Sequence, residues 1–470
     1  MTDIGFLLSR FHAASDSDAI VWRDRVVPFG QLIGSIKRAT ATLDAHDVRA
    51  GTVVSLEADF SPNSAAVLLA LIERDCIVVP LTTAVEASKP TLRRTAEVET
   101  IVEIWPDDVA VVRTTGVAAR HPLTAELRRR RHPGFVIFSS GSTGVSKAAL
   151  HDFVPFLERF RERRWTVRAI SFLMFDHIGG LNTLLSVLAN GGCVVTLSER
   201  SPQPVCEAIE RHRVELLPTS PTFLNLLLIS EAYRHFDLTS LKVVSYGTEV
   251  MLEGTLRRLR AALPGVKFVQ KYGLSELGIL DSKTRGDDAL WLEIGGAGSQ
   301  VRVVDGMLEI RTPAAMLGYL NASSPFTADG WFPTGDAVEV DGRYMRVLGR
   351  RSEMINVGGE KVFPSEIEGV LQEMPGVLDV VVSGEIHRIF GYIIRARVRL
   401  DTTESVPDFR QRMRRYCRDK LPRYKIPQKV EIAAGDLHAA RFKKMRAEGG
   451  SEPEPPRDER MELHHERESR

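Results

Sequence analysis

The 470-residue sequence is poor in cysteine, in excess charge of either sign and in long apolar runs. Its four cysteines, Cys76, Cys193, Cys206 and Cys417, form no C-x-x-C pair, which argues against a disulfide framework and against a zinc site. The net charge of +1 gives no reason to expect nucleic acid or an acidic membrane as a partner. Apolar stretches such as 65–72 are too short to span a bilayer, and we expect no signal peptide. The sequence therefore predicts a cytoplasmic protein with reduced cysteines and no membrane span.

The chain is long enough for two or more hydrophobic cores, and its apolar content of 43% is ordinary for a globular protein. Short β-rich runs alternate with helical patterns through most of it. The runs are 52–58, 76–81, 193–197, 214–219 and 241–247, and the helical patterns include 61–75 and 202–213. Such alternation predicts an α/β protein with largely parallel sheets.

The pattern changes twice towards the C-terminus. After about residue 295 it becomes short strands with turns, and the Asp-Gly pairs at 305–306 and 341–342 predict hairpins. Beyond Arg350 it predicts a compact α+β unit. Its expected helices are 364–373 and 407–420, and its expected strands lie near 378–383 and 392–399. Residues 448–470 are polar and rich in charge and proline, which is typical of a disordered tail.

One stretch has almost nothing to pack but much to offer a phosphate. The apolar run 135–138 is followed directly by SSGSTGVSK at 139–147, which supplies hydroxyls, glycines and backbone N–H groups. It is not a Walker loop, because Ser146 stands where that motif has glycine and Ala148 follows the lysine. The stretch therefore predicts a phosphate-binding loop of another kind.

Four further motifs follow this loop in order: QKYGLSELG (270–278), GWFPTGDAVEVDGRYMRVLGR (330–350), SEMINVGGEKVFPSEIE (352–368) and LPRYKIPQKVEI (421–432). Together they resemble the adenylate-forming superfamily of acyl-CoA synthetases, adenylation domains and luciferases, and acyl-CoA synthetases most of all. The resemblance implies a large domain (1–350) of parallel-rich sheets flanked by helices plus a β-rich subdomain. It also implies a hinge (351–352, with Ser352 in the hinge position) and a small mobile α+β domain (353–447).

The resemblance further implies an activity. In such enzymes a carboxylate attacks the α-phosphorus of ATP, which gives an acyl-adenylate and pyrophosphate, and the acyl group then passes to a thiol. Because a carboxylate oxygen is a weak nucleophile, the enzyme must position the reactants and neutralise charge. The implied cofactors are ATP and Mg²⁺, with CoA as the expected co-substrate. A carrier-protein phosphopantetheine is the alternative acceptor.

The residues that the resemblance assigns to ATP lie in several motifs. They are Ser139, Ser140, Gly141, Ser142, Thr143, Gly144 and Lys147 in the phosphate loop, then Gly247, Thr248, Glu249, Tyr272, Gly273, Ser275, Asp336, Arg350 and Lys444. Within this set, Thr143 and Lys147 would contact the leaving pyrophosphate, Tyr272 would stack on adenine, and Asp336 with Arg350 would hold the ribose. Glu276 would bind the magnesium ion, for which one hard carboxylate ligand is sufficient.

The acyl group is less well defined. In HIGGL (177–181), His177 matches an imidazole that borders the acyl pocket of acyl-CoA synthetases. An alternative alignment gives Asp176 the place of the acid that binds an α-amino group in amino-acid adenylation domains; HIGGLN matches over more positions, so we prefer an acid without an α-amine. We expect an apolar pocket and a tunnel for the thiol. The pocket would be bordered by Leu181, Tyr246, Leu274 and Ile279, and the tunnel by Gly358 and Gly359.

The catalytic lysine of the small domain lies in a blurred motif, DLHAARFKKMR at 436–446. Aligning Asp436 and Leu437 with the start of the family's motif places Lys444 in the catalytic position. Lys443 then replaces a glycine and is a rival candidate. A non-catalytic homologue that binds nucleotide without turnover is the third hypothesis, beside the CoA ligase and the carrier-protein-loading enzyme.

Overall fold

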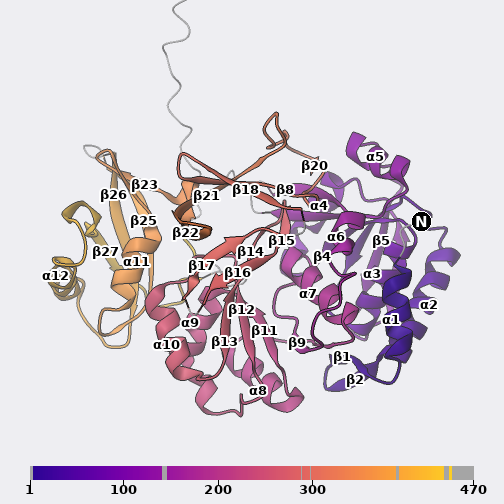
Figure 1. Cartoon of the computed structure of the whole chain (residues 1–470), viewed down its shortest axis with the longest axis horizontal. Coiled ribbons are helices and arrows are strands. Elements are labelled where there is room, and N and C mark those ends of the chain that lie inside the picture. Colours follow the sequence, from indigo (N-terminus) through magenta and orange to yellow (C-terminus); the bar gives the residue numbers. More distant parts are fainter. Residues whose placement is uncertain are drawn as a thin grey trace, which may run out of the picture.

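The computed structural model describes residues 4–139, 146–286, 288–296, 298–387, 391–438 and 444–446. Within them the chain forms two large α/β sheets, a β-rich sheet and a separate small α+β unit, which Figure 1 shows at the left. The α/β architecture predicted from the sequence is confirmed. Six residues of the phosphate loop (140–145), the rival Lys443 and the tail (448–470) lie outside the described part.

The first seven-stranded sheet has the order β20-β8-β7-β4-β3-β5-β6. Its centre (β7, β4, β3 and β5) is parallel, and β6, β8 and β20 are antiparallel to their neighbours. The strands are β3 (Val53–Glu57), β4 (Ile77–Leu81), β5 (Thr100–Ile104), β6 (Ala110–Thr114), β7 (Gly134–Ser139), β8 (Lys147–Asp152) and β20 (Gly318–Tyr319). Strands β3 and β4 are buried along their whole length, as expected for parallel strands covered on both faces.

The second seven-stranded sheet has the order β13-β12-β11-β9-β10-β1-β2 and is parallel except for the β1–β2 hairpin. Its strands are β1 (Asp18–Trp22), β2 (Arg25–Pro28), β9 (Arg168–Ile170), β10 (Cys193–Val195), β11 (Leu216–Thr219), β12 (Val243–Tyr246) and β13 (Lys267–Gln270). Three of these, β10 to β12, coincide with β-rich runs predicted from the sequence.

Ten α-helices accompany these two sheets in the described part of the chain. They are α1 (Gly5–Ala13), α2 (Phe29–Ala45), α3 (Pro62–Glu73), α4 (Lys89–Thr95), α5 (Pro122–Arg130), α6 (Phe153–Glu158), α7 (Ile178–Ala189), α8 (Pro202–His212), α9 (Pro221–Ser230) and α10 (Glu253–Ala262). The start of helix α3 at Pro62 follows from its sequence, because Ser61 and Ser64 form a capping box and Pro62 occupies the first turn. Buried on nearly all sides, α3 belongs to the main hydrophobic core.

The β-rich part is a six-stranded antiparallel sheet of order β16-β17-β22-β21-β19-β18. Its strands are β16 (Ser282–Arg285), β17 (Asp288–Ile294), β18 (Gln300–Val304), β19 (Met307–Arg311), β21 (Phe332–Asp341) and β22 (Tyr344–Arg350), and the short hairpin β14 (Tyr272–Leu274)–β15 (Gly278–Leu280) lies beside it. Both predicted Asp-Gly turns are present. They join β18 to β19 and β21 to β22, and Asp305, Gly306 and Gly342 have positive φ.

The small unit packs two helices on a five-stranded sheet. It comprises β23 (Ile355–Val357), β24 (Glu360–Val362), α11 (Pro364–Gln372), β25 (Val377–His387), β26 (Gly391–Leu400), α12 (Val406–Cys417) and β27 (Lys429–Ile432). Its apolar core is separate from those of the large domain. It contacts the large domain through an ion pair between Arg257 and Glu373 (2.8 Å) and a hydrogen bond from Asn225 Nδ2 to Asp379 Oδ1 (3.2 Å).

Two features bear on the environment of the chain. No helix in the described part is both long and apolar enough to cross a membrane. All four cysteines are free and buried, and burial raises the pKa of each thiol, to about 12 for Cys76 and Cys206. They are therefore unreactive core residues.

Candidate active site

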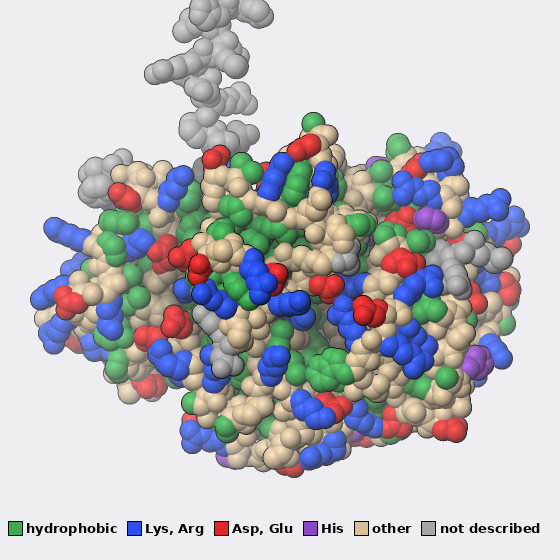
Figure 2. Space-filling view, in the orientation of Figure 1, with side chains coloured by type: hydrophobic (Ala, Val, Ile, Leu, Met, Phe, Trp, Pro, Cys, Tyr) green, Lys and Arg blue, Asp and Glu red, His purple; other side chains and the backbone are tan. Residues whose placement is uncertain are grey.

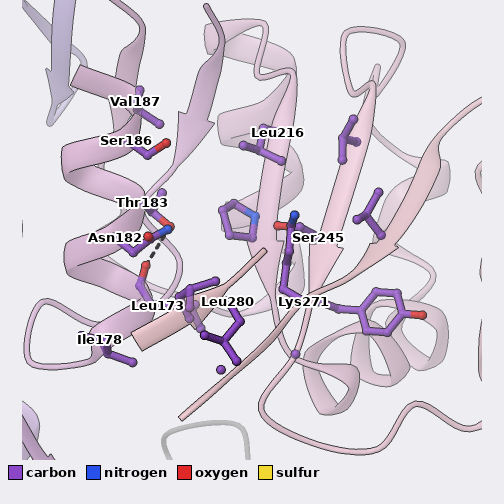
Figure 3. A pocket seen from close by; sticks show the side chains of 18 of the residues that line it. Leu173, Ile178, Asn182, Thr183, Ser186, Val187, Leu216, Ser245, Lys271 and Leu280 are labelled. Carbon is purple, nitrogen blue, oxygen red and sulfur yellow. Dashed lines mark hydrogen bonds between the residues drawn. The ribbon is translucent and has the colours of Figure 1, made fainter. Parts of the chain in front are cut away.

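A cavity of about 620 Å³ lies between α7 and the sheet strands β11 to β13. Figure 3 shows how its walls arise: Asn182, Thr183 and Ser186 point from the helix towards the strands that carry Leu216 and Ser245. On the strands most of the lining residues lie at alternate positions, as expected for one face of a sheet, and Thr219 and Tyr246 at the ends of β11 and β12 also line the cavity. The residues at alternate positions are Leu216 and Pro218 on β11, Val243 and Ser245 on β12, and Lys267 and Val269 on β13, with Lys271 directly after it. On α7 the lining residues have the spacing of one helix face. They are Ile178, Asn182, Thr183, Ser186 and Val187, and Asn190, directly after the helix, also lines the cavity.

His177 lies at the N-terminus of α7, where the helix meets this cavity. Its Nδ1 accepts a hydrogen bond from the backbone N–H of Gly179 at 3.1 Å, so the neutral ring carries its proton on Nε2. The neighbouring Asp176 is turned elsewhere: it is buried, its Oδ2 accepts from the Thr82 hydroxyl at 3.0 Å, and it is not among the cavity-lining residues. This arrangement favours the alignment in which His177, rather than Asp176, borders the acyl group.

Of the four residues predicted to border the acyl pocket, three line the cavity and one does not. Tyr246, Leu274 and Ile279 line the cavity, whereas Leu181 is fully buried in the main core and does not. Leu181 faces away because a helix has 3.6 residues per turn, which puts it on the opposite side from Asn182 and Ser186. Sequence reasoning missed Asn182 and Lys271. The alternation of the 241–247 and 267–271 strands was the signal that could have found Lys271.

Of the phosphate loop, the structure describes the two ends. Ser139 ends β7 and Lys147 begins β8, and the two residues pair across the hairpin. The described flank of the loop is held by Asn321, whose side chain bonds the carbonyl of Ser146 and the N–H of Ala148, both at 2.9 Å. Ser140, Gly141, Ser142, Thr143 and Gly144 lie outside the described residues.

Tyr319 connects this loop to the predicted metal ligand. Its hydroxyl donates to Glu276 Oε1 at 2.8 Å, and the Lys147 ammonium lies 5.3 Å from its ring centroid. Ser139 also donates to Glu276 Oε1, at 3.3 Å. Glu276 therefore lies beside both ends of the phosphate loop, and the tyrosine between them was not foreseen from the sequence. No described group of three or more His, Cys, Asp or Glu side chains forms a metal cluster.

The segment that carries Glu276 is anchored from behind by His151. This ring is fully enclosed, stacks on Phe135 at 4.7 Å, and its Nε2 donates to the carbonyl of Ser275 at 2.7 Å. Burial lowers the pKa of His151 to about 4, so the ring stays neutral and acts as a fixed donor. Gly273 and Ser275 themselves line the cavity.

Asp336 is buried between two partners. Its Oδ2 accepts from the Tyr272 hydroxyl at 2.5 Å, and its Oδ1 lies 3.3 Å from Arg350 Nε. Burial raises the pKa of Asp336, an effect that the charge of Arg350 opposes. Asp336 and Arg350, both assigned to the ribose from the sequence, thus lie together across β21 and β22, and their contact with a ribose stays a prediction. Tyr272 is 7% exposed, so its main contact here is Asp336, and its stacking on adenine stays a prediction.

The segment 247–249 also reaches the cavity. Gly247 and Thr248 line it, and Thr248 has a positive φ of 74°. A side chain at Gly247 would meet the carbonyl oxygen of Lys271 at 2.7 Å, which explains the glycine. Glu249 turns away instead: it accepts from the Thr222 hydroxyl at 2.5 Å and from the backbone N–H of Lys444 at 2.9 Å.

Lys444 is close to the domain boundary but directs its ammonium into the small domain. Its Nζ lies 2.9 Å from Glu368 Oε2 and 3.0 Å from the carbonyl of Val380. Glu368 also pairs with Arg446 at 3.0 Å. Burial would raise the pKa of Glu368, but the charges of Lys444 and Arg446 outweigh it and lower this pKa. The structure therefore does not bring Lys444 to the cavity, and its catalytic role stays a prediction.

The remaining predicted residues lie around the start of the small domain. Ser352 is the middle residue of a short 3-10 turn (Arg351–Glu353) between β22 and β23. Gly358 and Gly359 form the turn between β23 and β24, with φ of 60° and 98°. A side chain at either glycine would meet nothing within 4 Å, so their turn is open on its outer face.

Comparison with known families accounts for both parts of the chain. The model of the AMP-binding enzyme family matches residues 9–332, and the model of the AMP-binding enzyme C-terminal domain matches residues 366–444. The chain belongs to the AMP-binding enzyme family. The resemblance inferred from the five motifs is confirmed, and the gap between the two matches contains Ser352.

Curated relatives are named as ligases. The indoleacetate–CoA ligase of Aromatoleum aromaticum is 29% identical over 332 residues, and an uncharacterized acyl–CoA ligase of Bacillus subtilis is 30% identical over 343 residues. The match covers 63% of this chain and 63% of the first relative, and 67% and 68% for the second. A medium/long-chain-fatty-acid–[acyl-carrier-protein] ligase of Mycobacterium tuberculosis is 27% identical, with 83% and 82% covered.

Solved structures share the fold. An anthranilate CoA ligase in complex with anthranoyl-AMP superimposes with a TM-score of 0.80 at 19% identity, covering 95% of each chain. The o-succinylbenzoate CoA synthetase of Bacillus subtilis, in complex with its acyl-adenylate, gives 0.75 at 22% identity, covering 94% of this chain and 96% of that one. At these identities the likeness establishes the fold alone.

Proposed function

We propose that this protein uses ATP to convert a carboxylic acid into an acyl-adenylate, releasing pyrophosphate, and then transfers the acyl group to the thiol of CoA. One observation carries the proposal. A single cavity is lined on one side by His177 and apolar side chains, and on the other by Thr248, Ser275 and Arg350 from the motifs assigned to the nucleotide. The ligase names of the curated relatives support it.

In the first step a carboxylate oxygen bonds to the α-phosphorus while the bond from that phosphorus to pyrophosphate breaks. The acid would lie with its carboxylate beside His177, which lines the cavity at the start of α7. Lys147 would offset the charge of the departing pyrophosphate. Asp336, fixed by Tyr272 and Arg350, would hold the ribose hydroxyls. Its carboxylate would then accept hydrogen bonds from the ribose as well as from Tyr272 and Arg350.

Glu276 is the residue that would hold magnesium, and its surroundings fit that ion. The side-chain hydrogen bonds from Ser139 and Tyr319 both go to Oε1, so Oε2 has no donor among the described residues and could serve as a hard ligand. When bound, the ion would neutralise phosphate charge. Tyr319 fixes the carboxylate, and Lys147 lies on the same tyrosine ring.

For the second step we infer that the small domain (353–447) turns about Ser352, so that Gly358 and Gly359 face the thiol. The contacts that must then break include those of Arg257 with Glu373, of Asn225 with Asp379 and of the Lys444 N–H with Glu249. The first is an exposed ion pair and contributes little, whereas the second is a buried hydrogen bond whose groups must find other partners or water after the rotation. A cytoplasmic location, where ATP and CoA are available, agrees with four free, buried cysteines.

A carrier protein is the second candidate acceptor. The Mycobacterium tuberculosis relative that matches along most of this chain is named for transfer to acyl-carrier protein rather than to CoA. Both acceptors present the same phosphopantetheine thiol, so the first step is common to them and the open face of the 358–359 turn suits either.

The test separates these steps. Purified protein is given ATP, Mg²⁺ and a panel of carboxylic acids, and pyrophosphate release is measured, first alone and then with CoA or a phosphopantetheinylated carrier protein. Lys147→Ala is the matched variant, because it removes the charge beside the loop, and adenylation should slow about 10- to 1000-fold. If none of the acids in a broad panel gives pyrophosphate release, the proposal is overturned in favour of a non-catalytic nucleotide-binding homologue. Release that Lys147→Ala leaves unchanged would remove the loop from the site.

A further inference from the structure

Lys271 is a cation in a cavity that both apolar and polar side chains line. It follows β13 directly, and its position puts its side chain on the same face as Ser245 and Val269, so it points into the cavity (Figure 3). No described carboxylate lies within 4.0 Å of its ammonium, and no described residue accepts a hydrogen bond from it. An ammonium in this position is costly unless something pairs with it.

The charges around Lys271 do not supply that partner. Those that act on it most strongly are Asp281, Arg164, Arg159 and Lys267. The one acid in this set, Asp281, already pairs with Arg164 (3.2 Å) and Arg159 (3.7 Å). Burial, opposed by Asp281 and assisted by the cations, lowers the pKa of Lys271. This end of the cavity therefore has an excess of positive charge, and Figure 2 shows Lys and Arg side chains around the hollow near the middle of this face.

The nucleotide residues lie apart from Lys271. Asp336 bonds Tyr272, and Glu276 and Lys147 contact Tyr319, and none of these five residues lines the cavity that Lys271 enters. The reacting carboxylate must lie at the nucleotide side, where His177 meets the cavity. Lys271 is thus placed for a different part of the same acid.

The cavity also offers neutral polar groups near this lysine. Ser245 is its neighbour on β12, and Asn182 faces the strands from α7 (Figure 3). Asn182 Oδ1 is buried with no hydrogen-bond partner among the described residues. A side-chain amide can turn either its NH₂ or its oxygen to a ligand, so Asn182 can donate to an anionic group. A plain alkyl chain would leave both Lys271 and Asn182 unsatisfied.

The geometry points to a substrate with two anionic ends: a carboxylic acid that carries a second carboxylate, held by Lys271 with Ser245 and Asn182, while its first carboxylate is adenylated. This inference rests on the proposed ligase function and narrows its substrate class. An apolar spacer between the two carboxylates fits the apolar side chains that line the strand wall, Leu216, Pro218 and Val269. Lys271 would be a specificity-determining residue rather than one that acts on the reacting atoms.

The experiment uses pairs of acids that differ only in the second carboxylate: heptanedioic against heptanoic acid, and ring-carboxylated phenylpropanoic acids against phenylpropanoic acid. Pyrophosphate release gives kcat/KM for each. Wild type should prefer the diacid of at least one pair by about 10- to 100-fold, the usual worth of a hydrogen-bonded charge. Lys271→Met, which keeps the length and removes the charge, should abolish or reverse this preference. Lys283→Met is the matched control, because it removes the same charge from β16, where the side chain is exposed and does not line the cavity, and should change the preference at most about twofold.

Several outcomes overturn the inference while leaving the ligase function intact. Wild type that favours the monoacid in every pair is one. Equal loss on diacid and monoacid in Lys271→Met is another, because it would place Lys271 at the reacting carboxylate. If Lys271→Met turns over neither acid, calorimetric binding of the two acids gives the same ratio without turnover: a lost preference supports the inference and a retained one contradicts it. Failure of the ligase function itself would show differently, as no pyrophosphate release from any acid.

Discussion

Two partly buried lysines in this chain have opposite surroundings. Lys444, in the small domain, has its ammonium between Glu368 and the carbonyl of Val380, and the pair is extended by Arg446. Lys271, in the cavity of the large domain, has no described carboxylate within 4.0 Å and three cations among its strongest electrostatic neighbours. A buried cation with its partner present stabilises the fold in that arrangement, whereas one that lacks a partner is suited to a ligand. The comparison is most directly tested by removing each charge in turn.

The largest effect is expected for Lys444→Ala on the first step. If Lys444 leaves Glu368 during adenylation and reaches the transferring charge, its loss should slow pyrophosphate release by about 100- to 1000-fold. Transfer to CoA from supplied acyl-AMP should stay near wild type, because that step follows after the small domain has turned. This second measurement is also the folding control, since it requires an intact small domain.

Lys443→Ala is the matched variant for that prediction. Lys443 lies outside the described residues, so the alignment alone assigns the two roles. An adenylation defect in Lys443→Ala, with Lys444→Ala close to wild type, would make Lys444 a purely structural partner of Glu368. In that case the register of the DLHAARFKKMR motif is shifted by one.

Glu368→Gln tests the paired side of the comparison through stability. It leaves Lys444 and Arg446 in place without the carboxylate that neutralises both, and we expect a loss of about 3 kcal/mol in the free energy of unfolding of the small domain. Thermal or urea unfolding of the full-length chain measures it. The exposed ion pair of Arg257 with Glu373 supplies the control, because Glu373→Gln should cost less than about 1 kcal/mol. Equal losses would show that the Glu368 cluster is not a stabilising centre.

Glu368 also predicts an acid dependence of defined sign. The pKa of this carboxyl is lowered in the folded state, so its contribution to stability is present above its unfolded value and is lost as the pH falls through the folded one. Wild type should therefore lose stability below about pH 4.5, the ordinary value for Glu, and Glu368→Gln should lose less over that range. Parallel pH profiles for the two proteins would contradict this assignment.

A smaller effect is expected at the start of α7. His177→Ala should reduce kcat/KM for the preferred acid by about tenfold, through loss of one hydrogen-bond donor beside the carboxylate. Asp176→Ala removes a buried partner of Thr82 rather than a cavity group, so it should lower the melting temperature more than it lowers kcat/KM. Loss of activity that is confined to α-amino acids in Asp176→Ala would restore the amino-acid alternative.

The sequence predicted the parts of this site that are local. The two ends of the phosphate loop, the Asp-Gly hairpins and the pair of Asp336 with Arg350 each depend on residues close together in the chain or on motifs kept in order. The other contacts of the site join residues that are far apart in the sequence. Lys444 and Glu368 are 76 residues apart, and Tyr319 meets Glu276 from another strand, so no local pattern encodes either contact.

Lys271 shows the same limit within a single motif. In QKYGLSELG it reads as an exposed lysine at the end of a strand, and only the packing of α7 over β11 to β13 encloses it. Leu181 shows the converse, because a leucine in a substrate motif turned out to belong to the core. The alternation of strands and the face of a helix can be read from a sequence, but which faces leave a cavity between them cannot.

The smallest effect concerns the stability of the unpaired lysine without any ligand. Folding lowers the pKa of Lys271, chiefly through burial, so the folded protein binds this proton less tightly than the unfolded chain does. Stability should therefore rise with pH between the folded pKa and the ordinary value of 10.5, which is opposite in sign to the usual effect of a paired lysine. Lys271→Met should lack this rise and be as stable as wild type, or more so, near neutral pH. A saturating diacid should remove the rise in wild type by supplying the missing anion, whereas the matched monoacid should not. Urea unfolding at a series of pH values, with and without each acid, measures all three curves. A wild-type curve that falls over this range, while that of Lys271→Met does not, would mean that Lys271 is already paired in the folded protein.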